Sequence, residues 1–473
     1  MSVSEPAVSR RLASPRLLAA VLVFLAVQST AVASLGTPLL PTVQHVERVS
    51  LAASQWALTI TLLAGAVATP LMGRLGDGRL RRPTAVGAVA VMLAGCVLSA
   101  LPAGFPVFLA GRALQGAGLG LVPLATAVAR DDLPAERSRS AIALIGVTTA
   151  AGIGIGYPLV GLLAQVLGLY APFWCAAGLS AVALAAALAA LPPSPARPAR
   201  VDAAGAVLLG AGIAGLLLVL AQGPAWGGWA SAATLAGAVV SVALLAAWAG
   251  WELRARRPLV ELRLLGRRAV LAANLTVFGI AVGFYPLVSL TVRFAQMPPS
   301  AGYGLGAPVV VAAALLTPFS LASFAASRFA ARTARRTSAE LVVAASCVLL
   351  VASMVLFLVA RDSYVGLVVT MTACGLGVGS VYTVNPLQIT GGVPAAETGS
   401  AISFYQLVRT VAYAIGSALS ATVLVLSTPP GQRYPADAGY SAAALVSIAV
   451  LAAALVVSTL FAMRRPVPGR FGP

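Results

Sequence analysis

The stretch GRLGDGRLRR, residues 73–82, concentrates four arginines and one carboxylate, Asp77, between two long apolar runs. In the whole chain of 473 residues, 59% are hydrophobic and only 9% are charged, and the mean hydropathy is +0.94. A soluble globular protein has about 25% charged residues. The chain has too few charged residues to cover a water-facing surface, and we expect an integral membrane protein.

The apolar runs are long enough to cross a bilayer, because a membrane-spanning helix needs about 20 mostly apolar residues. The predicted spans cover residues 17–40, 51–72, 84–102, 105–128, 141–166, 170–191, 203–222, 230–250, 269–290, 307–327, 339–360, 364–386, 398–426 and 440–463. The sequence therefore predicts an all-α integral membrane fold with about 14 transmembrane helices.

The basic residues indicate the orientation of the chain. All 31 are arginines, and most lie in alternate loops between the apolar runs. Cytoplasmic loops carry an excess of positive charge, so both termini are expected in the cytoplasm. Arg293 and Arg361 then fall in outer loops, whereas Arg112 and Arg409 fall within spans. We expect the net charge of +18 to reflect topology and contacts with membrane lipids, not nucleic acid.

Residue types that serve catalysis or metal binding are sparse. The chain has one histidine, His45, and its four cysteines share no metal-type spacing. Because lysine is absent, no GxxxxGK[ST] loop of a nucleotide-driven pump exists. All 13 acids fall in loops or at the ends of spans. We therefore expect no enzyme activity, no metal site and no cofactor.

An internal repeat divides the chain. Residues 73–83 align with residues 327–337, which places Arg74 on Arg328 and Arg81 on Arg335. Both segments join spans on the side expected to be cytoplasmic. Duplicated halves around a site at the membrane midplane are typical of secondary transporters.

The first copy of this repeat resembles the loop 2–3 signature of the major facilitator superfamily. The matching residues are Gly73, Gly76, Asp77, Arg81 and Arg82. The resemblance implies a cytoplasmic gate, in which Asp77 pairs with nearby arginines and with the start of the helix near Thr398. A carboxylate is favoured at a helix N-terminus. The alternative is that the arginines only hold the loop in the cytoplasm.

The fourth predicted span contains GRALQGAGLG, residues 111–120, which resembles the helix-4 motif of the superfamily through Arg112, Gln115 and Gly116. An arginine within a span is costly unless it faces a cavity or a partner, so Arg112 is a functional candidate. The resemblance implies that it takes part in proton coupling. For the glycines, the alternative is close helix packing.

The fifth span contains GIGIGYPLVG, residues 152–161, which resembles the antiporter signature of drug exporters in the superfamily. The residues concerned are Gly152, Gly156, Tyr157, Pro158 and Gly161. Tyr157 departs from the signature, because it occupies the usual proline position and Pro158 follows it. The alternative is a helix that is simply bent and closely packed.

Nearly the whole chain resembles the fourteen-helix drug:proton antiporters of this superfamily. The resemblance implies two pseudo-symmetric six-helix bundles, residues 1–200 and 269–473. Residues 201–268 would form two extra helices and a cytoplasmic linker. The resemblance also implies a central cavity lined by the first, fourth, ninth and twelfth spans.

Polar residues in the spans are candidates for the substrate cavity: Gln28, Asn274, Asn385 and Arg409. Gln28 stands about where proton-coupled members carry an aspartate, and a glutamine cannot titrate. Coupling could instead use Asp77, Asp202 or another acid at the end of a span, together with Arg112. For each amide, the alternative is an interhelical hydrogen bond.

The favoured function is a secondary active exporter of small amphipathic molecules, of the multidrug or antibiotic efflux type, that works by alternating access with proton antiport. We expect a monomer in the plasma (inner) membrane, with a small-molecule substrate, protons and lipids as partners. One alternative is an uncoupled or uptake permease for a neutral or anionic molecule. A transport-dead sensor or scaffold is the other, which the short polar tails disfavour.

Overall fold

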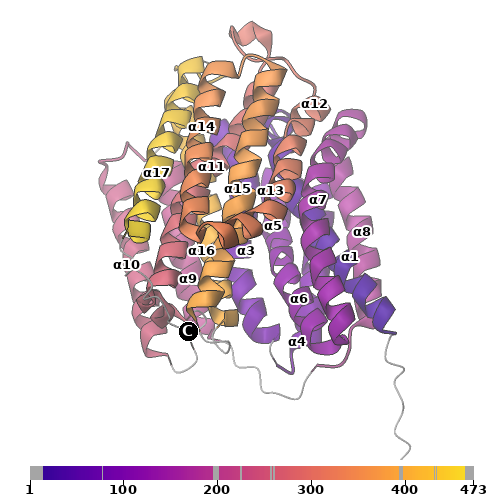
Figure 1. Ribbon diagram of the computed structural model, residues 1–473. Helices are drawn as coiled ribbons and strands as arrows, with labels where there is room; N and C mark the ends of the chain where they lie inside the picture. The colour runs from indigo at the N-terminus through magenta and orange to yellow at the C-terminus, as the bar shows by residue number, and fades with distance from the viewer. Residues whose placement is uncertain are drawn as a thin grey trace, which may run out of the picture.

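The computed structural model describes residues 14–76, 78–194, 202–223, 226–255, 258, 261–393, 398–430, 432 and 434–463. Every regular element in these residues is a helix. The helices run side by side as one elongated bundle, with the early part of the chain on one side and the late part on the other (Figure 1).

The first half of the chain, called the N half below, comprises α1 to α8. Its helices are α1 (Pro15–Ser34), η1 (Thr37–Leu39), α2 (Leu40–Val46), α3 (Leu51–Gly76), α4 (Arg81–Ala100), α5 (Phe105–Gly116), η2 (Ala117–Gly120), α6 (Leu121–Asp132), α7 (Ala135–Leu167) and α8 (Ala171–Ala190). Two further helices follow, α9 (Ala203–Gln222) and α10 (Ala232–Arg254).

The last part, called the C half below, comprises η3 to α17. Its helices are η3 (Leu262–Gly266), α11 (Arg268–Gln296), η4 (Pro299–Ala301), α12 (Val309–Ala314), α13 (Thr317–Arg336), α14 (Ala339–Ala360), α15 (Tyr364–Gly392), α16 (Thr398–Leu426) and α17 (Asp437–Met463).

The membrane fold predicted from the sequence is confirmed. Thirteen helical segments of the described chain are long and apolar enough to cross a membrane. The fourteenth is α7, whose 33 residues extend for about 50 Å at about 1.5 Å per residue. Its last part, Gly156–Leu167, is an apolar helix that is itself shorter than a span, and the side chains of residues 146–155 before it are not described.

Local sequence signals begin and end these helices. Ser338 and Ser363 stand before α14 and α15 and accept hydrogen bonds from the backbone N–H groups of Leu341 at 3.1 Å and Gly366 at 3.0 Å. Such side-chain caps satisfy donors that have no partner within the helix. Gly168 ends α7 with a φ of +88°, a conformation that glycine adopts most readily.

The hydrophobic core is divided between the two halves. One cluster of buried side chains lies within residues 18–191 and another within residues 280–454. A third cluster packs α3 against α9 and α16, so the two extra helices cover one edge of the junction between the halves. This division agrees with two bundles, while the domain boundaries at residues 200 and 268 stay a prediction.

Two ends of the bundle are distinguished below. The terminal end holds the start of α1, the α3–α4 turn and the end of α17, at the bottom of Figure 1. The distal end holds the α1–α3, α7–α8 and α11–α12 connections.

The structure corrects the position of Arg293. The ninth span does not stop at residue 290, because α11 continues to Gln296. Arg293 therefore lies within a helix and is only 3% exposed, not in an outer loop as the sequence predicted.

Candidate functional site

The predicted gate at the terminal end is partly outside the described residues. Asp77 is among the residues that are not described, as are residues 394–397 before α16. The pairing of Asp77 with α16 therefore stays a prediction. Gly73 lies within α3 and Gly76 ends it. A Cβ at Gly76 would overlap the side chain of Leu124 in α6, so this glycine permits a close helix contact.

The basic pair after the gate is bound within the N half. Arg81 is buried and forms ion pairs with Asp131 at 2.6 Å and Asp132 at 3.1 Å, at the end of α6. Arg82 donates a hydrogen bond from Nη2 to the carbonyl oxygen of Leu188 in α8, at 2.7 Å. These contacts fix the start of α4. No sequence pattern predicted the pairing of Arg81 with the two aspartates.

Arg112 is enclosed within the N half. Its side chain is 1% exposed, and Nε donates to the carbonyl oxygen of Ala57 in α3 at 2.8 Å. Its Nη1 donates to Oε1 of Gln115, and the ring of Phe173 in α8 lies 5.9 Å from the guanidinium carbon. Nη2 is buried and has no hydrogen-bonding partner among the described residues.

The two neighbours of Arg112 in the helix-4 motif extend this packing. Gln115 donates from Nε2 to the carbonyl oxygen of Gly95 and to Oγ of Ser99, both at 3.2 Å. A Cβ at Gly116 would come within 2.5 Å of a backbone oxygen of α3. Arg112, Gln115 and Gly116 thus hold α3, α4 and α5 together. A role of Arg112 in proton coupling stays a prediction, and no described carboxylate pairs with it.

The antiporter-like motif lies in α7 at the junction of the halves. A Cβ at Gly161 would be 2.7 Å from Cβ of Ala313 and 2.9 Å from the carbonyl oxygen of Val309, both in α12. Gly156 lies against Ser34 of α1 in the same way. The surroundings of Gly152 are not described. The backbone of α7 therefore meets the C half directly at Gly161, near the distal end.

The two residues that follow Gly156 also face this junction. Tyr157 packs against the hydrophobic core of the C half, and Thr37 is a hydrogen-bonding neighbour of its hydroxyl. Pro158 lies inside α7, where a proline removes one backbone hydrogen bond of the helix.

A buried arginine that the sequence placed outside the membrane joins the two halves at the distal end. Arg293 of α11 donates to Oε1 of Gln44 at 3.4 Å, to Oγ of Ser54 at 3.1 Å and to Oε1 of Gln55 at 3.0 Å. Gln55 in turn donates from Nε2 to Oγ of Ser417 in α16 at 2.7 Å. An arginine within a span would have marked Arg293 as a candidate, but the predicted ninth span ended at residue 290 and did not include it.

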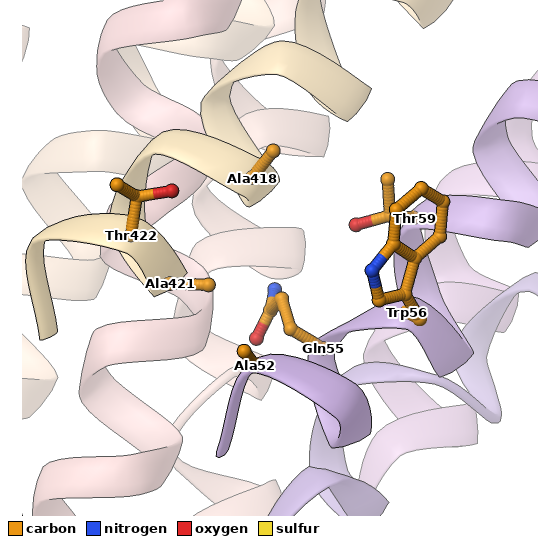
Figure 2. Close-up of a pocket in the computed structure, with 7 residues that line it drawn as sticks. All are labelled: Ala52, Gln55, Trp56, Thr59, Ala418, Ala421 and Thr422. Atoms are coloured by element: carbon orange, nitrogen blue, oxygen red, sulfur yellow. The ribbon is translucent and has the colours of Figure 1, made fainter. Parts of the chain in front are cut away.

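A small pocket lies beside this contact, between α3 and α16 (Figure 2). It is lined by Ala52, Gln55, Trp56, Thr59, Ala418, Ala421 and Thr422. The amide of Gln55 lies between the two helices in Figure 2. Thr422 donates to the carbonyl oxygen of Leu220 in α9 at 2.7 Å, so one of the extra helices is bound to the same junction.

The four polar candidates for a cavity separate into two groups. Gln28 donates from Nε2 to the carbonyl oxygen of Ala176 at 3.0 Å and to Oγ of Ser180 at 2.7 Å, both in α8. This contact is the interhelical hydrogen bond that the sequence left as the alternative to a cavity role. The other three candidates lie together in the C half.

Asn274, Asn385 and Arg409 lie on α11, α15 and α16. Asn385 donates from Nδ2 to the carbonyl oxygen of Ala273 at 3.3 Å, which places it beside Asn274. The side-chain oxygens of both asparagines and the hydroxyl of Tyr405 are buried without a hydrogen-bonding partner among the described residues. Tyr405 and Arg409 are four residues apart on α16, and therefore share one helix face.

Arg409 is surrounded by aromatic rings. Its guanidinium carbon lies 4.8 Å from the ring centre of Tyr382 and 6.0 Å from that of Tyr413. Tyr413 donates a hydrogen bond to the hydroxyl of Tyr382 at 2.7 Å and stacks on Tyr285 with 4.7 Å between ring centres. We call these residues, with Tyr405 and Phe284, the Arg409 cluster.

Two carboxylates at the terminal end, Asp202 and Glu252, form a pair that the sequence did not predict. Glu252 of α10 is 1% exposed and accepts a hydrogen bond from Nε1 of Trp248 at 3.0 Å. Asp202 accepts one from Nε1 of Trp251 at 2.8 Å. A Cβ at Gly205 would lie 2.7 Å from an oxygen of each acid, so the two carboxyl groups lie close together.

Comparison with known proteins identifies the family. The sequence profile of the Major Facilitator Superfamily matches residues 17–417. The multidrug resistance protein Stp of Mycobacterium tuberculosis is 26% identical over 395 residues, which are 81% of this chain and 71% of that protein. The tetracenomycin C resistance and export protein of Streptomyces glaucescens is 33% identical over 52% of this chain and 45% of its own length.

Other matches agree with this. An uncharacterized transporter of Mycobacterium tuberculosis is 30% identical over 54% of this chain, and the chain spans only 37% of that protein's length. The nucleoside transporter NupG has the same fold, with a TM-score of 0.64 at 15% identity over 95% of this chain and 100% of that chain. The chain belongs to the major facilitator superfamily of membrane transporters.

Proposed function

We propose that the chain is a secondary active exporter of small amphipathic molecules, which works by alternating access with proton antiport in the plasma membrane. The relatives named for multidrug resistance and tetracenomycin C export support the export direction. We further propose that it acts as a monomer with both termini in the cytoplasm.

One observation carries the alternating-access part of this proposal. Among the described residues, the hydrogen bonds between the N half and the C half lie in the distal part of the bundle. They involve Arg293, Gln296, Ser417 and the backbone of Val310. Such a distribution is expected of a transporter closed at one end, whose halves rock about a central site.

We assign the proton-binding group of this mechanism to the pair of Asp202 and Glu252. Gln28 cannot titrate and faces α8. The two carboxyl groups of the pair lie close together next to membrane-spanning helices, whereas the acids Asp131 and Asp132 are both bound by Arg81. The second candidate function, an uncoupled permease for a neutral or anionic molecule, is favoured by the lack of Asp and Glu in α11, α15 and α16, which build the Arg409 cluster.

Flux through proteoliposomes tests these two functions against each other. Three probes with one ring system are added across a pH gradient: naphthalenesulfonate, naphthamide and naphthyltrimethylammonium. Antiport predicts that at least one probe crosses faster than in empty liposomes, and that a trapped pH dye reports proton movement with it.

Glu252→Gln is expected to keep probe movement and lose proton movement, while Glu261→Gln at the surface keeps both. Probe movement without proton movement would support the permease, and no movement of any probe would contradict both functions.

Alternating access is tested at Gly161. A leucine there would overlap Ala313 and Val309, and overpacking of about 1–3 kcal/mol would oppose closure of the distal end and slow transport about tenfold or more. Gly178→Leu in α8 is the matched control, because a Cβ at Gly178 meets nothing within 4 Å. Equal transport rates for the two variants would contradict the mechanism.

A further inference from the structure

The Arg409 cluster contains a positive charge, and the proposed transport mechanism assigns no role to it. Arg409 lies 11 residues from the start of α16, about 16 Å along the helix at about 1.5 Å per residue, and thus deep in the membrane. A charged side chain at this depth normally faces a bundle interior or an aqueous cavity and has a partner. The inference below rests on the proposed function, because it names the substrate class of the exporter.

The cluster provides no negative partner for this cation. The helices that build it, α11, α15 and α16, contain no Asp or Glu. Among the described residues, no hydrogen bond is formed by the guanidinium, and Nε is buried without a partner. The contacts of Arg409 are with the faces of Tyr382 and Tyr413. One positive charge therefore remains uncompensated in the middle of the bundle.

The surroundings of Arg409 are flat and polar at the edges. Tyr285 and Tyr413 are stacked at an angle of 25°, and Phe284 contacts both rings edge to face. The rings of Tyr285, Tyr382 and Tyr413 keep some exposed surface although they lie in mid-span. The hydroxyl of Tyr405 and the side chain of Asn385, which lie near each other, add buried polar oxygens without a well-formed hydrogen bond to the described residues.

We propose that the Arg409 cluster binds an aromatic anion, and that the exported molecules are planar aromatic compounds with a sulfonate, carboxylate or phenolate group. The anionic group would accept hydrogen bonds from the guanidinium, whose planar fork suits two oxygens of one group. The aromatic part would lie against the stacked rings of Tyr285 and Tyr413, where offset stacking is favourable.

The same features act against cations. Tyrosine faces attract a quaternary ammonium group, but here the guanidinium of Arg409 already occupies the faces of Tyr382 and Tyr413 and repels a second positive charge. A neutral aromatic molecule keeps the stacking and loses the charge-assisted hydrogen bonds. The expected order of affinity is therefore anion, then neutral molecule, then cation.

Binding measurements on the intact protein test this order without any variant. The protein is placed in nanodiscs of zwitterionic lipid, with empty nanodiscs as the blank, and titrated with naphthalenesulfonate, naphthamide and naphthyltrimethylammonium. The sulfonate is expected to bind about tenfold or more tightly than the amide, since charge-assisted hydrogen bonds are roughly twice as strong as neutral ones. Equal binding of the three probes, or tightest binding of the ammonium compound, would overturn the proposal.

Variants then assign the preference to one side chain. Arg409→Gln is expected to abolish the difference between the sulfonate and the amide. Arg361→Gln, the control, removes another buried arginine of the C half, which pairs with Asp437 at 2.8 Å, and is expected to keep the difference. A difference that persists in Arg409→Gln would contradict the proposal.

The outcomes also separate this inference from the proposed function. Sulfonate binding that depends on Arg409, without flux in proteoliposomes, would support the site and contradict the exporter. Flux of the amide or the ammonium compound that is unaffected by Arg409→Gln would support a transporter and contradict the substrate class.

Discussion

The two arginines predicted to lie within spans, Arg112 in the N half and Arg409 in the C half, have opposite surroundings. Arg112 is 1% exposed and donates to a backbone carbonyl of α3 and to Gln115. Arg409 keeps some exposed surface, makes no hydrogen bond within the described residues and lies over the faces of Tyr382 and Tyr413.

This difference shows how a membrane-embedded arginine acquires a role. Where protein oxygens accept hydrogen bonds from two of its three nitrogens, as around Arg112, it holds helices together. Where aromatic faces are its main contacts, its donors stay available and an anion from outside the protein can supply the missing acceptors. We therefore expect substitution of Arg112 to act mainly on the fold and substitution of Arg409 mainly on the ligand.

The largest effect is expected at Arg112. Arg112→Gln removes the donors to Ala57 and Gln115. The carbonyl oxygen of Ala57 keeps a hydrogen bond from Thr61, but Oε1 of Gln115 loses the donor of Arg112 while it stays buried, which costs about 1–3 kcal/mol. The fraction of folded, monodisperse protein after heating in detergent measures this loss. Arg409→Gln is the matched control, and its thermal stability is expected to stay close to that of the unmodified protein. If Arg112→Gln were as stable as Arg409→Gln, the two roles would not be distinct.

A smaller effect is expected at Arg293, which is buried where the two halves meet. Its hydrogen bonds to Gln44, Ser54 and Gln55 join the halves, and each contributes about 1 kcal/mol net. Arg293→Gln should therefore favour opening of the distal end while the halves stay folded.

Labelling measures this opening. A cysteine introduced by Ser417→Cys, in a chain without native cysteines, should react faster with a water-soluble thiol reagent from the distal side when Arg293→Gln is also present. The control is Arg361→Gln, because Arg361 is 6% exposed but bonds to Ser441 and Asp437 within the C half. Equal rates in both backgrounds would show that Arg293 does not hold the distal end closed.

Most of the fold could be predicted from the sequence, because apolar runs of membrane length leave little choice of structure. The prediction failed at helix ends. The first span was drawn to residue 40, whereas α1 ends at Ser34 and two short helices follow, and α11 is longer than its most apolar part. Polar residues near the ends of spans lower the local hydropathy, so a predicted span stops before them. Whether such residues are buried depends on neighbours from other helices.

The candidate site was predictable in part. Position within a span identified Arg112, Arg409 and the two asparagines as unusual, but not which of them contact one another. The partners of Arg81 lie about 50 residues away in the chain, and those of Arg293 lie in the other half. Such pairings depend on tertiary packing, which local sequence patterns do not contain. The contact of Gln28 with α8 likewise depends on how the helices pack, and the sequence alone did not predict it.

Cysteine accessibility tests the contrast between the two arginines most directly. The four native cysteines, Cys96, Cys175, Cys347 and Cys374, are replaced by alanine, and Arg112→Cys and Arg409→Cys are introduced separately. We predict that a water-soluble thiol reagent labels Arg409→Cys in native membrane vesicles. Arg112→Cys should react only after unfolding in detergent. Equal labelling of both variants in native vesicles, or no labelling of Arg409→Cys, would contradict the account.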